Sequence, residues 1–561
     1  MLGFLLILLS TGCSREAKTP EKQASTQAAQ VASSELVVVS TNDFHAALDR
    51  AEGLASIIRE QRKRYGDHMI YLDAGDQFQG SLEGNIRKGE AVIDFFNLLH
   101  PDAAALGNHE FDYGPEVSGR VTVKQGDDGM GNLRERIQKA NFPVLSANFI
   151  LNPPVSCAPG PKCNALGQET VFEPRAVFQR AAGKVCVIGV TTPLTRNITN
   201  PAFLRGVVFA DMKPVIQAEA QRFRGSEHCD WVLLLAHEGL RYESDGKTLK
   251  NTGLLPLLED LPPSTVDAVI AGHSHAVVQT VIRGMPVVQT GKGAKNVGVL
   301  HLTRSGSSIS SRFEPWIKVP DTAVAFDVTS LLMPYRREAL DYKRRITGVT
   351  TAPFLFDKTS ESALGNLVAD AMHHVDHVKS DCAVINAGAI RSTLPHGRIS
   401  NENVFRLMPF DDTLVVVDLT GTELRSLLEV SGSGALGVPS VSGLYVKYLR
   451  VPSRRPGPWD RDLNGDGKKE EWERNLVVDI RDAGGKPLDP NRTYRVATTS
   501  YLVEGGDFSS IVYDHIPPSR IHYYENLLVR DAIAAYLQRE SPLNPAHFCS
   551  PGHSRITFQT P

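Results

Sequence analysis

Metal-binding residue types follow short apolar runs at several places in the first half of the chain, and this pattern constrains the fold more than any other feature. Residues 36–39, 69–72, 231–236 and 266–271 are typical of short buried strands. Four segments with metal-ligand residue types follow these runs: Asn42-Asp43-Phe44-His45, Gly75-Asp76, His237 and Gly272-His273-Ser274-His275. A fifth such segment, Gly107-Asn108-His109-Glu110, stands elsewhere in the first half. In an open α/β sheet, ligands bind beyond the carboxyl ends of the strands. The spacing therefore predicts one shared metal site in an α/β domain.

The composition is typical of a globular protein that acts on small molecules. The chain has 561 residues, of which 42% are hydrophobic and 22% charged, which is enough for two large cores. Its formal net charge of −3 gives no basic excess of the kind that nucleic-acid-binding proteins show. We therefore expect a small-molecule substrate and no nucleic-acid partner.

The N-terminus is typical of a bacterial lipoprotein signal over residues 1–13. Residues 3–9 are apolar but too few to span a bilayer, which takes roughly 20 residues. Leu9-Ser10-Thr11-Gly12-Cys13 resembles a lipoprotein cleavage site. Because no Lys or Arg precedes the apolar stretch, an ordinary secretory signal or a wrongly assigned start is the alternative. We predict export, lipidation of Cys13, anchoring to a bacterial membrane in the periplasm or at the cell surface, and a flexible tether over residues 14–34.

The rest of the chain divides into two parts. Strand and helix signals alternate up to about residue 325, and a second set of strand runs and Gly-rich turns begins near residue 351. We predict a first domain over residues 35–325, a linker helix over 326–350 and a second domain over 351–561.

Cysteine usage agrees with export. Cys157 and Cys163 flank a turn-rich loop, so we expect a small disulfide there in an oxidising compartment. Cys186 and Cys229 either pair with each other or remain buried free thiols.

The motifs of both halves carry a family resemblance. Asn-Asp-x-His, Gly-Asp, Gly-Asn-His-Glu-Phe-Asp, a lone His and Gly-His-x-His, in this order, resemble the calcineurin-like metallophosphoesterases. The second half resembles the C-terminal domain of the 5′-nucleotidase and UDP-sugar hydrolase family through Gly365-Asn366-Leu367, Asn386-Ala387-Gly388-Ala389-Ile390-Arg391, Pro409-Phe410 and Gly505-Gly506-Asp507. The resemblance implies a four-layer α/β/β/α metallophosphoesterase domain followed by a second α/β domain that binds the substrate.

The donor types favour transition metals. Mixed imidazole, carboxylate and amide ligands suit Zn, Mn, Fe or Co better than an all-oxygen Mg or Ca site. The family pattern implies one metal held by Asp43, His45 and His275, a second held by Asn108, His237 and His273, and Asp76 bridging the two. Metals bridged in this way lie about 3.5–4 Å apart and share a hydroxide, which would be the nucleophile.

His109 is expected to act on the reacting group instead of binding metal. The resemblance implies that His109 stabilises charge on the phosphoryl group or leaving oxygen, and that Asp112 holds its imidazole. The alternative is an ordinary structural histidine.

The second half is expected to select the substrate. Phe410 and Tyr501 match the family's two aromatic positions that sandwich a nucleobase, and stacking of this kind contributes about 1–3 kcal/mol per base. Asp507 matches the acceptor of ribose hydroxyl groups, and Asn386 and Arg391 match groups at the phosphate end. Without the motif context, the two aromatics would be read as ordinary core residues.

Two departures from the family pattern bear on the substrate. An arginine that related nucleotidases carry shortly before Gly-Asn-Leu is missing, because Thr359-Ser360-Glu361-Ser362 stand there. Asp411 and Asp412 follow Phe410 where small or amide residues are common, which adds negative charge near the base. Both changes are expected to disfavour polyphosphates.

One segment, residues 462–473, fits a structural calcium loop. It places oxygen ligands at Asp462, Asn464 and Asp466, a carbonyl at Lys468 and a bidentate carboxylate at Glu473, with Gly467 at the turn. A solvated acidic turn is the alternative, because Lys469 stands at an aliphatic position and no clear helix precedes the loop.

Together these features predict a secreted, dinuclear metal-dependent phosphomonoesterase that hydrolyses 5′-nucleotides to nucleoside and phosphate. Alternatives within the enzyme class are a 2′,3′-cyclic-nucleotide phosphodiesterase, a UDP-sugar or nucleotide pyrophosphatase, and the related dimanganese thiosulfohydrolase of sulfur oxidation. From another class, the chain would be a nucleotide-binding surface lipoprotein without activity, against which the complete ligand set argues.

Overall fold

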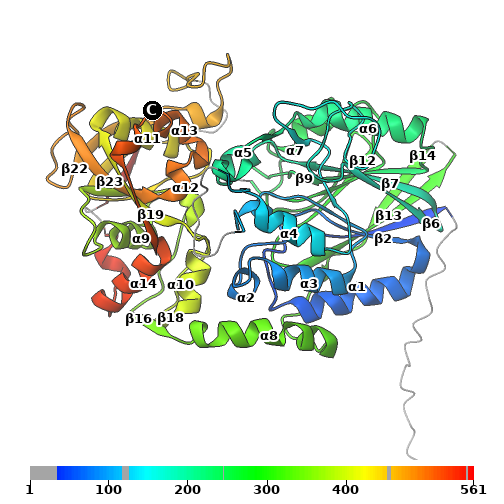
Figure 1. The fold of residues 1–561 in the computed structure, drawn as a ribbon, viewed down its shortest axis with the longest axis horizontal. Helices are drawn as coiled ribbons and strands as arrows, with labels where there is room; N and C mark the ends of the chain where they lie inside the picture. The colour runs from blue at the N-terminus through cyan, green and yellow to red at the C-terminus, as the bar shows by residue number, and fades with distance from the viewer. Residues whose placement is uncertain are drawn as a thin grey trace, which may run out of the picture.

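The protein consists of two α/β domains joined by a long helix (Figure 1). The computed structural model describes residues 34–116, 126–243, 245–306, 308–451, 457–550 and 554–560. Cys13 and most of the predicted tether lie outside these residues.

Two sheets form the centre of the first domain. The first sheet has the order β14-β13-β1-β2-β3-β4, with β15 also paired to β13, and the second has the order β11-β12-β10-β9-β7-β6. The strands of the first sheet are β1 (Glu35–Thr41), β2 (Met69–Asp73), β3 (Ala103–Ala105), β4 (Val144–Leu145), β13 (Asn296–Ser305), β14 (Ser308–Phe313) and β15 (Ile317–Lys318). Those of the second are β6 (Arg175–Arg180), β7 (Gly183–Thr191), β9 (Trp231–His237), β10 (Ala268–Ala271), β11 (Val277–Ile282) and β12 (Met285–Thr290).

Alternation along the buried strands explains why these two sheets stack. In β1, Leu36 and Val38 join a core shared with the second sheet, whereas Val37 and Val39 pack toward helices. Side chains at successive positions of a strand point to opposite faces, and a strand covered on both faces needs an almost continuous apolar run. The sequence of β1 meets this requirement, and β9 alternates in the same way.

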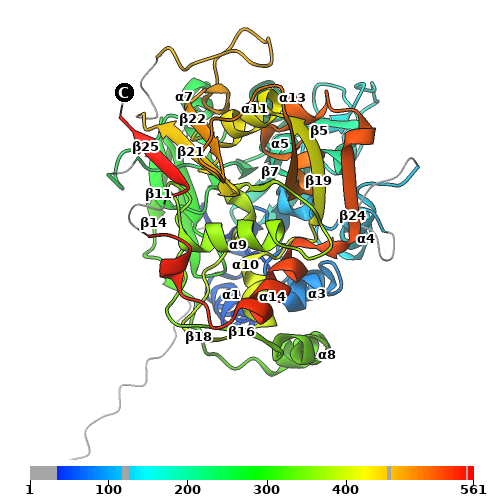
Figure 2. The same ribbon diagram turned by 90° about the vertical axis from the view of Figure 1, so that its left-hand side faces the viewer.

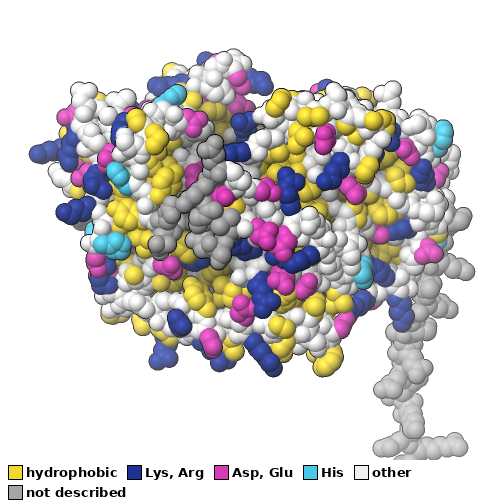
Figure 3. All heavy atoms as spheres, viewed as in Figure 1, with side chains coloured by type: hydrophobic (Ala, Val, Ile, Leu, Met, Phe, Trp, Pro, Cys, Tyr) yellow, Lys and Arg dark blue, Asp and Glu magenta, His cyan; other side chains and the backbone are white. Residues whose placement is uncertain are grey.

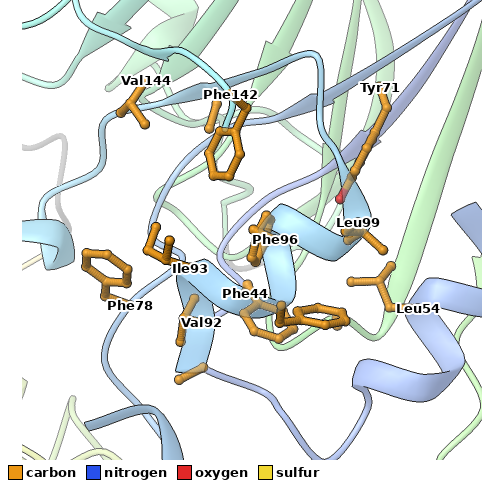
Figure 4. Packing of buried hydrophobic residues seen from close by; sticks show 14 of the residues in the cluster. Phe44, Leu54, Tyr71, Phe78, Val92, Ile93, Phe96, Leu99, Phe142 and Val144 are labelled. Atoms are coloured by element: carbon orange, nitrogen blue, oxygen red, sulfur yellow. The ribbon is translucent and has the colours of Figure 1, made fainter. Parts of the chain in front are cut away.

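Helices cover the outer faces of both sheets. The first sheet is covered by α1 (Ala51–Tyr65), α3 (Glu90–Leu99) and α4 (Gly131–Lys139), and the second by α6 (Met212–Gly225) and α7 (Leu254–Asp260). Aromatic side chains fill the first of these layers: Phe44 lies against Phe95 and Phe96, with ring centroids 5.5 and 5.3 Å away. Figure 4 shows Phe44 and Phe96 among the buried side chains of this layer. The predicted four-layer α/β/β/α arrangement is confirmed. Shorter elements complete the domain: α2 (Leu82–Asn85), β5 (Phe149–Leu151), α5 (Thr195–Ile198) and β8 (Val207–Phe209).

The helix α8 (Phe326–Lys343) connects the domains and packs along α2 and α3 of the first and α10 of the second (Figure 1). The second domain has a five-stranded sheet in the order β20-β17-β23-β19-β24, covered by α9 and α14 on one face and α11 on the other (Figure 2). Its strands and helices are β16 (Ile346–Thr350), α9 (Ala363–His373), β17 (Cys382–Ile385), β18 (Gly397–Ser400), α10 (Asn401–Leu407), β19 (Thr413–Thr420), α11 (Gly421–Ser431), β20 (Ser440–Ser442), β21 (Leu444–Leu449), β22 (Val477–Asp482), β23 (Thr493–Thr499), α12 (Ser500–Val503), α13 (Ser510–Tyr513), β24 (Ile521–Leu528), α14 (Val529–Glu540) and β25 (Ile556–Gln559).

Both cysteine pairs considered from the sequence are disulfides. Cys157 is bonded to Cys163, and Cys186 is bonded to Cys229, so the alternative of buried free thiols at the second pair is wrong. Within the part of the chain that the structure describes, none of the helices has the length and apolar character needed to cross a membrane.

The surface carries charges of both signs. On the face seen in Figure 3, Lys and Arg side chains lie interspersed with Asp and Glu side chains over both domains.

Candidate metal centre and substrate pocket

The predicted metal ligands gather because five strands end at one place. Asp43, Asp76 and Asn108 follow β1, β2 and β3 of the first sheet, while His237 ends β9 and His273 follows β10 of the second. The carboxyl ends of these parallel strands point to the same edge of the sandwich. Sites in α/β sheets form at this edge.

The loops that carry the ligands are bent sharply. Left-handed backbone angles occur at five predicted ligands, with φ of 50° at Asp43, 48° at His45, 55° at Asp76, 69° at His273 and 60° at His275. Each non-glycine residue in this region costs about 1–2 kcal/mol, and such strain persists only where the surroundings fix it. Here, backbone N–H groups of Asp43 and His45 donate to the carbonyls of Gly75 and Asp76, both at 2.9 Å.

The first donor group consists of Asp43, His45, Asp76 and His275, whose ligand atoms all lie within 4.8 Å of one another. The Nε2 atoms of His45 and His275 are 2.9 Å apart, and Nε2 of His275 is 3.3 Å from Oδ1 of Asp43. Two imidazole nitrogens and two carboxylates therefore face one point.

The second donor group consists of Asp76, His237 and His273. The amide oxygen of Asn108 joins it, 3.1 Å from Nε2 of His237 and 3.0 Å from Nδ1 of His273. Nδ1 of His237 lies 2.7 Å from the carbonyl oxygen of Ala74, an acceptor, so Nδ1 carries the proton and Nε2 is left as a lone-pair donor. Asp76 belongs to both groups, as the resemblance implies for a bridging ligand.

These two groups suit two divalent metal ions. The donors are imidazole nitrogens, carboxylate oxygens and one amide oxygen, and all but the edges of His45, His273 and His275 are buried. Two buried carboxylates so close together inside a protein would be costly without a compensating positive charge.

His109 stands beside the donor groups but takes no part in either. Its Nδ1 lies 2.6 Å from Oδ2 of Asp112, and its backbone N–H donates to Oδ1 of Asp76 at 2.9 Å. Burial alone would lower the pKa of His109, but the carboxylates of Asp112 and Asp76 outweigh it and raise this pKa above its usual value. Asp112 thus orients a basic imidazole toward the metal groups.

Residues of the two donor groups line a cavity of about 460 Å³ between the two domains. Residues of both domains line it: Asp76, Asn108, His109, Asp112, His273 and His275 from the first, and Asn386, Arg391, Phe410, Tyr501 and Asp507 from the second. All five predicted substrate residues therefore line the same cavity as His109, Asp112 and four of the seven predicted metal ligands, whereas Asp43, His45 and His237 are not among its lining residues.

The second domain reaches His109, the predicted catalytic histidine, through Arg391 and Phe410. A guanidinium nitrogen of Arg391 is 3.5 Å from Nε2 of His109, and the Arg391 guanidinium lies 5.7 Å from the centre of the Phe410 ring. The Phe410 and His109 rings are 6.1 Å apart at an interplanar angle of 24°.

The remaining residues predicted to bind substrate form a hydrogen-bonded set. The carboxylate of Asp507 accepts from the Tyr501 hydroxyl at 2.8 Å and from the side-chain amide of Asn386 at 2.6 Å. A carboxylate has about four acceptor positions, so Asp507 retains capacity for hydroxyl groups of a ligand. The Tyr501 hydroxyl is also 3.4 Å from the carbonyl oxygen of Asn197 in the first domain.

Sequence reasoning missed two cationic residues of this cavity. Lys358 and Arg241 line it, from the second and first domains respectively. Burial, and to a smaller extent the nearby Arg391 guanidinium, lowers the pKa of Lys358 to about 8. Lys358 precedes Thr359, so the segment that lacks the family arginine still supplies a cation, and the expected loss of positive charge at this place is smaller than predicted.

The acidic pair after Phe410 also contributes less charge than expected. Asp411 forms an ion pair with Arg530. Burial, and to a smaller extent the nearby carboxylate of Asp112, raises the pKa of Asp412 to about 8, so its carboxyl group is mostly neutral at neutral pH.

A further missed residue is Glu110, which supports the metal loops. Its carboxylate accepts from the backbone N–H groups of Gln77 at 2.6 Å, Gly107 at 2.7 Å and Asp76 at 3.2 Å. Gly107 has no room for a side chain, since an added Cβ would lie 2.3 Å from Oδ1 of Asp76. The signal in the sequence was the Glu that follows His109 directly in the motif.

The predicted calcium residues lie together on the loop of residues 457–475. The side chains of Asp462, Asn464 and Asp466 accept from backbone N–H groups of the loop. Glu473 is buried and accepts from the N–H groups of Leu463, Asn464 and Glu470. Lys468 contributes its backbone to the same turn. Calcium binding stays a prediction.

Comparisons with known proteins agree with this geometry. Residues 36–277 match the family model of the calcineurin-like phosphoesterases, and residues 346–513 match that of the 5′-nucleotidase C-terminal domain. The chain is 25% identical over 563 residues to the protein UshA of Escherichia coli K12, covering 91% of this chain and 92% of UshA. It is 27% identical over 545 residues to the 5′-nucleotidase of Homo sapiens, covering 86% and 85%. Among solved structures, a 5′-nucleotidase precursor of Thermus thermophilus superposes with a TM-score of 0.73 at 25% identity, over 93% of this chain and 99% of that one.

Proposed function

We propose that this chain, which belongs to the metallophosphoesterase family in which a calcineurin-like phosphoesterase domain is followed by a 5′-nucleotidase C-terminal domain, removes phosphate from 5′-nucleotides. One observation carries the proposal: residues of the two donor groups that share Asp76 line one cavity together with Phe410, Tyr501 and Asp507. A metal-dependent phosphate site would thus adjoin a site for a nucleoside.

The residues at the metal end would handle the phosphate. Two divalent transition ions bound by the donor groups would neutralise the phosphoryl oxygens and lower the pKa of the attacking water. Arg391 and Lys358 supply further positive charge to the same end of the cavity. With Nδ1 of His109 held by Asp112, its Nε2 is the atom that would donate a hydrogen bond, and then a proton, to the leaving 5′ oxygen.

The residues of the second domain would hold the nucleoside. Phe410 and Tyr501 line the cavity from separate hydrophobic clusters and would stack on the base from its two faces. Asp507 would accept hydrogen bonds from the ribose hydroxyl groups with the acceptor capacity that Tyr501 and Asn386 leave free.

A phosphate-release assay tests this function. We expect release from AMP and UMP that a chelator abolishes and added Zn or Mn restores. A panel with ADP, ATP, UDP-glucose, a 2′,3′-cyclic nucleotide and a thiosulfate adduct separates the alternatives within the enzyme class. Binding of AMP with no turnover of any panel member in the presence of metal would instead identify a binding protein without activity.

A second activity, hydrolysis of nucleotide pyrophosphates such as UDP-sugars, is favoured by the two additional cations. Arg241 and Lys358 line the same cavity as Arg391 and would offset the negative charge of a second phosphate. We expect Arg241→Gln to raise KM for ATP or UDP-glucose more than KM for AMP. Arg312→Gln, at an exposed position of β14, is the matched control. Equal changes for AMP and ATP would remove Arg241 from phosphate recognition.

We also propose that the protein is exported and anchored through a lipid on Cys13. The two disulfides support export, because disulfides persist in oxidising compartments. Detergent partitioning tests the anchor: the full chain should enter the detergent phase, and Cys13→Ser should move it to the aqueous phase. If both proteins partition alike, Cys13 carries no lipid.

A further inference from the structure

The turn that carries Asp507 has an unfavourable backbone. Asp507 and Phe508 follow Gly505-Gly506 and have φ of 53° and 63°, in the left-handed region. Such angles at two successive non-glycine residues need support from neighbouring groups. The hydrogen bonds to Asp507 from Tyr501 and Asn386 hold its carboxylate from the cavity side.

The other support comes from the loop of residues 457–475. The Trp472 ring lies parallel to the Phe508 ring, with centroids 4.5 Å apart and an interplanar angle of 3°. Trp472 is 8% exposed, and its Nε1–H donates to Glu470 at 2.7 Å, so the indole is held in place. The loop also reaches the first domain, where Nζ of Lys250 is 3.7 Å from the Glu471 carboxylate.

We propose that Trp472 is a positioning residue for the ribose site: by stacking on Phe508 it fixes the strained turn and thereby the direction of the Asp507 carboxylate. This inference rests on the proposed function, in which Asp507 accepts hydrogen bonds from ribose hydroxyl groups. It gives the loop a role in substrate binding that is independent of any calcium ion.

The test compares two substrates that differ only in the groups that Asp507 would bind. AMP carries both ribose hydroxyl groups, whereas 2′,3′-dideoxyadenosine 5′-monophosphate carries neither. Trp472→Leu should raise KM for AMP about 2- to 12-fold, which is what ~0.5–1.5 kcal/mol for one aromatic pair gives at ~1.4 kcal/mol per tenfold. KM for the dideoxy nucleotide should stay unchanged, and kcat should change little for either substrate.

Three further variants make the result decisive. Trp472→Phe keeps an aromatic ring and should restore most of the affinity for AMP. Phe508→Leu removes the same stack from the other side and should reproduce the Trp472→Leu effect, which serves if Trp472→Leu does not fold. In an Asp507→Asn background, Trp472→Leu should add nothing to KM for AMP, because residues that act through one contact are not additive.

Each outcome separates the inference from the proposed function. An equal rise of KM for both substrates, or no rise for AMP, overturns the role of Trp472 while nucleotide hydrolysis stands. If Asp507→Asn raises KM for AMP and for the dideoxy nucleotide by the same factor, the ribose role of Asp507 is wrong, and the inference is overturned with it. If AMP is not hydrolysed at all, the proposed function has failed.

Discussion

Replacing Asp76 should remove bound metal, whereas replacing His109 should leave the metal content unchanged. Asp76 is the residue whose two carboxylate oxygens reach both donor groups, with Oδ1 3.2 Å from Nε2 of His237 and Oδ2 3.9 Å from Nε2 of His45. Asp76→Asn leaves one uncharged oxygen for two sites. Changes around metal ligands alone cost roughly 10- to 100-fold in metal affinity, so loss of a shared ligand should exceed this and remove most bound metal together with activity.

His109→Ala should abolish turnover and leave the metal in place. Its side chain belongs to neither donor group. Loss of a general acid lowers kcat by about 10²- to 10⁴-fold, or ~2.7–5.4 kcal/mol at ~1.36 kcal/mol per tenfold. Elemental analysis of the purified variants, beside phosphate release from AMP, measures both quantities. Asp321→Asn, an equivalent change at an exposed carboxylate, is the control. Metal loss in His109→Ala, or full metal content in Asp76→Asn, would refute the ligand assignment.

Two further predictions concern the second domain. Replacing Phe410 or Tyr501 with Ala should raise KM for nucleotides by about 5- to 150-fold, from the ~1–3 kcal/mol of base stacking, and should hardly affect a small artificial phosphate ester; equal losses on both substrates would indicate an ordinary core role. Millimolar calcium should raise the Tm of the wild type, by an amount that corresponds to about 2.7 kcal/mol at a hundredfold excess over Kd, and Asp462→Ala or Glu473→Ala should remove the rise. The calcium comparison requires a metal centre already saturated with its transition metal, and an unchanged Tm would leave the loop as a solvated acidic turn.

The sequence was sufficient to predict that the candidate metal ligands gather at one place, because these residues follow strands that are apolar on both faces. The runs before Asp43, Asp76 and His237 correspond to β1, β2 and β9. The strand before Asn108 was not recognised: β3 is Ala103–Ala105, which lacks the β-branched residues that mark a strand, and is defined by its pairing with β2 and β4.

What the sequence left open depends on contacts between distant segments. Arg241 and Lys358 stand in unrelated parts of the chain, and only domain packing brings them into one cavity. The stack of Trp472 on Phe508 joins two segments that the sequence gives different roles: the predicted calcium loop and the motif that contains Asp507, the predicted acceptor of ribose hydroxyl groups. The spacing of apolar residues cannot predict such pairings, because it depends only on residues that are close together in the sequence.

Glu110 offers a test of how the metal loops are held in place. Its buried carboxylate accepts from the backbone N–H groups of Gln77, Gly107 and Asp76. In Glu110→Gln, the amide oxygen can keep one of these bonds, but the new NH₂ group must face backbone donors that then lose their acceptor. A buried donor without a partner costs about 1–3 kcal/mol, so the variant should have a lower Tm. It should also bind less metal, because one of the donors that Glu110 holds is the backbone N–H of Asp76, the predicted bridging ligand. Glu540→Gln, at an exposed ion pair with Arg539 at the end of α14, should change the free energy of unfolding by about 0–1 kcal/mol and leave metal content unchanged. If Glu110→Gln has the stability and metal content of the Glu540→Gln control, these three hydrogen bonds do not determine the shape of the metal site, and the ligand loops must be held by the strands alone.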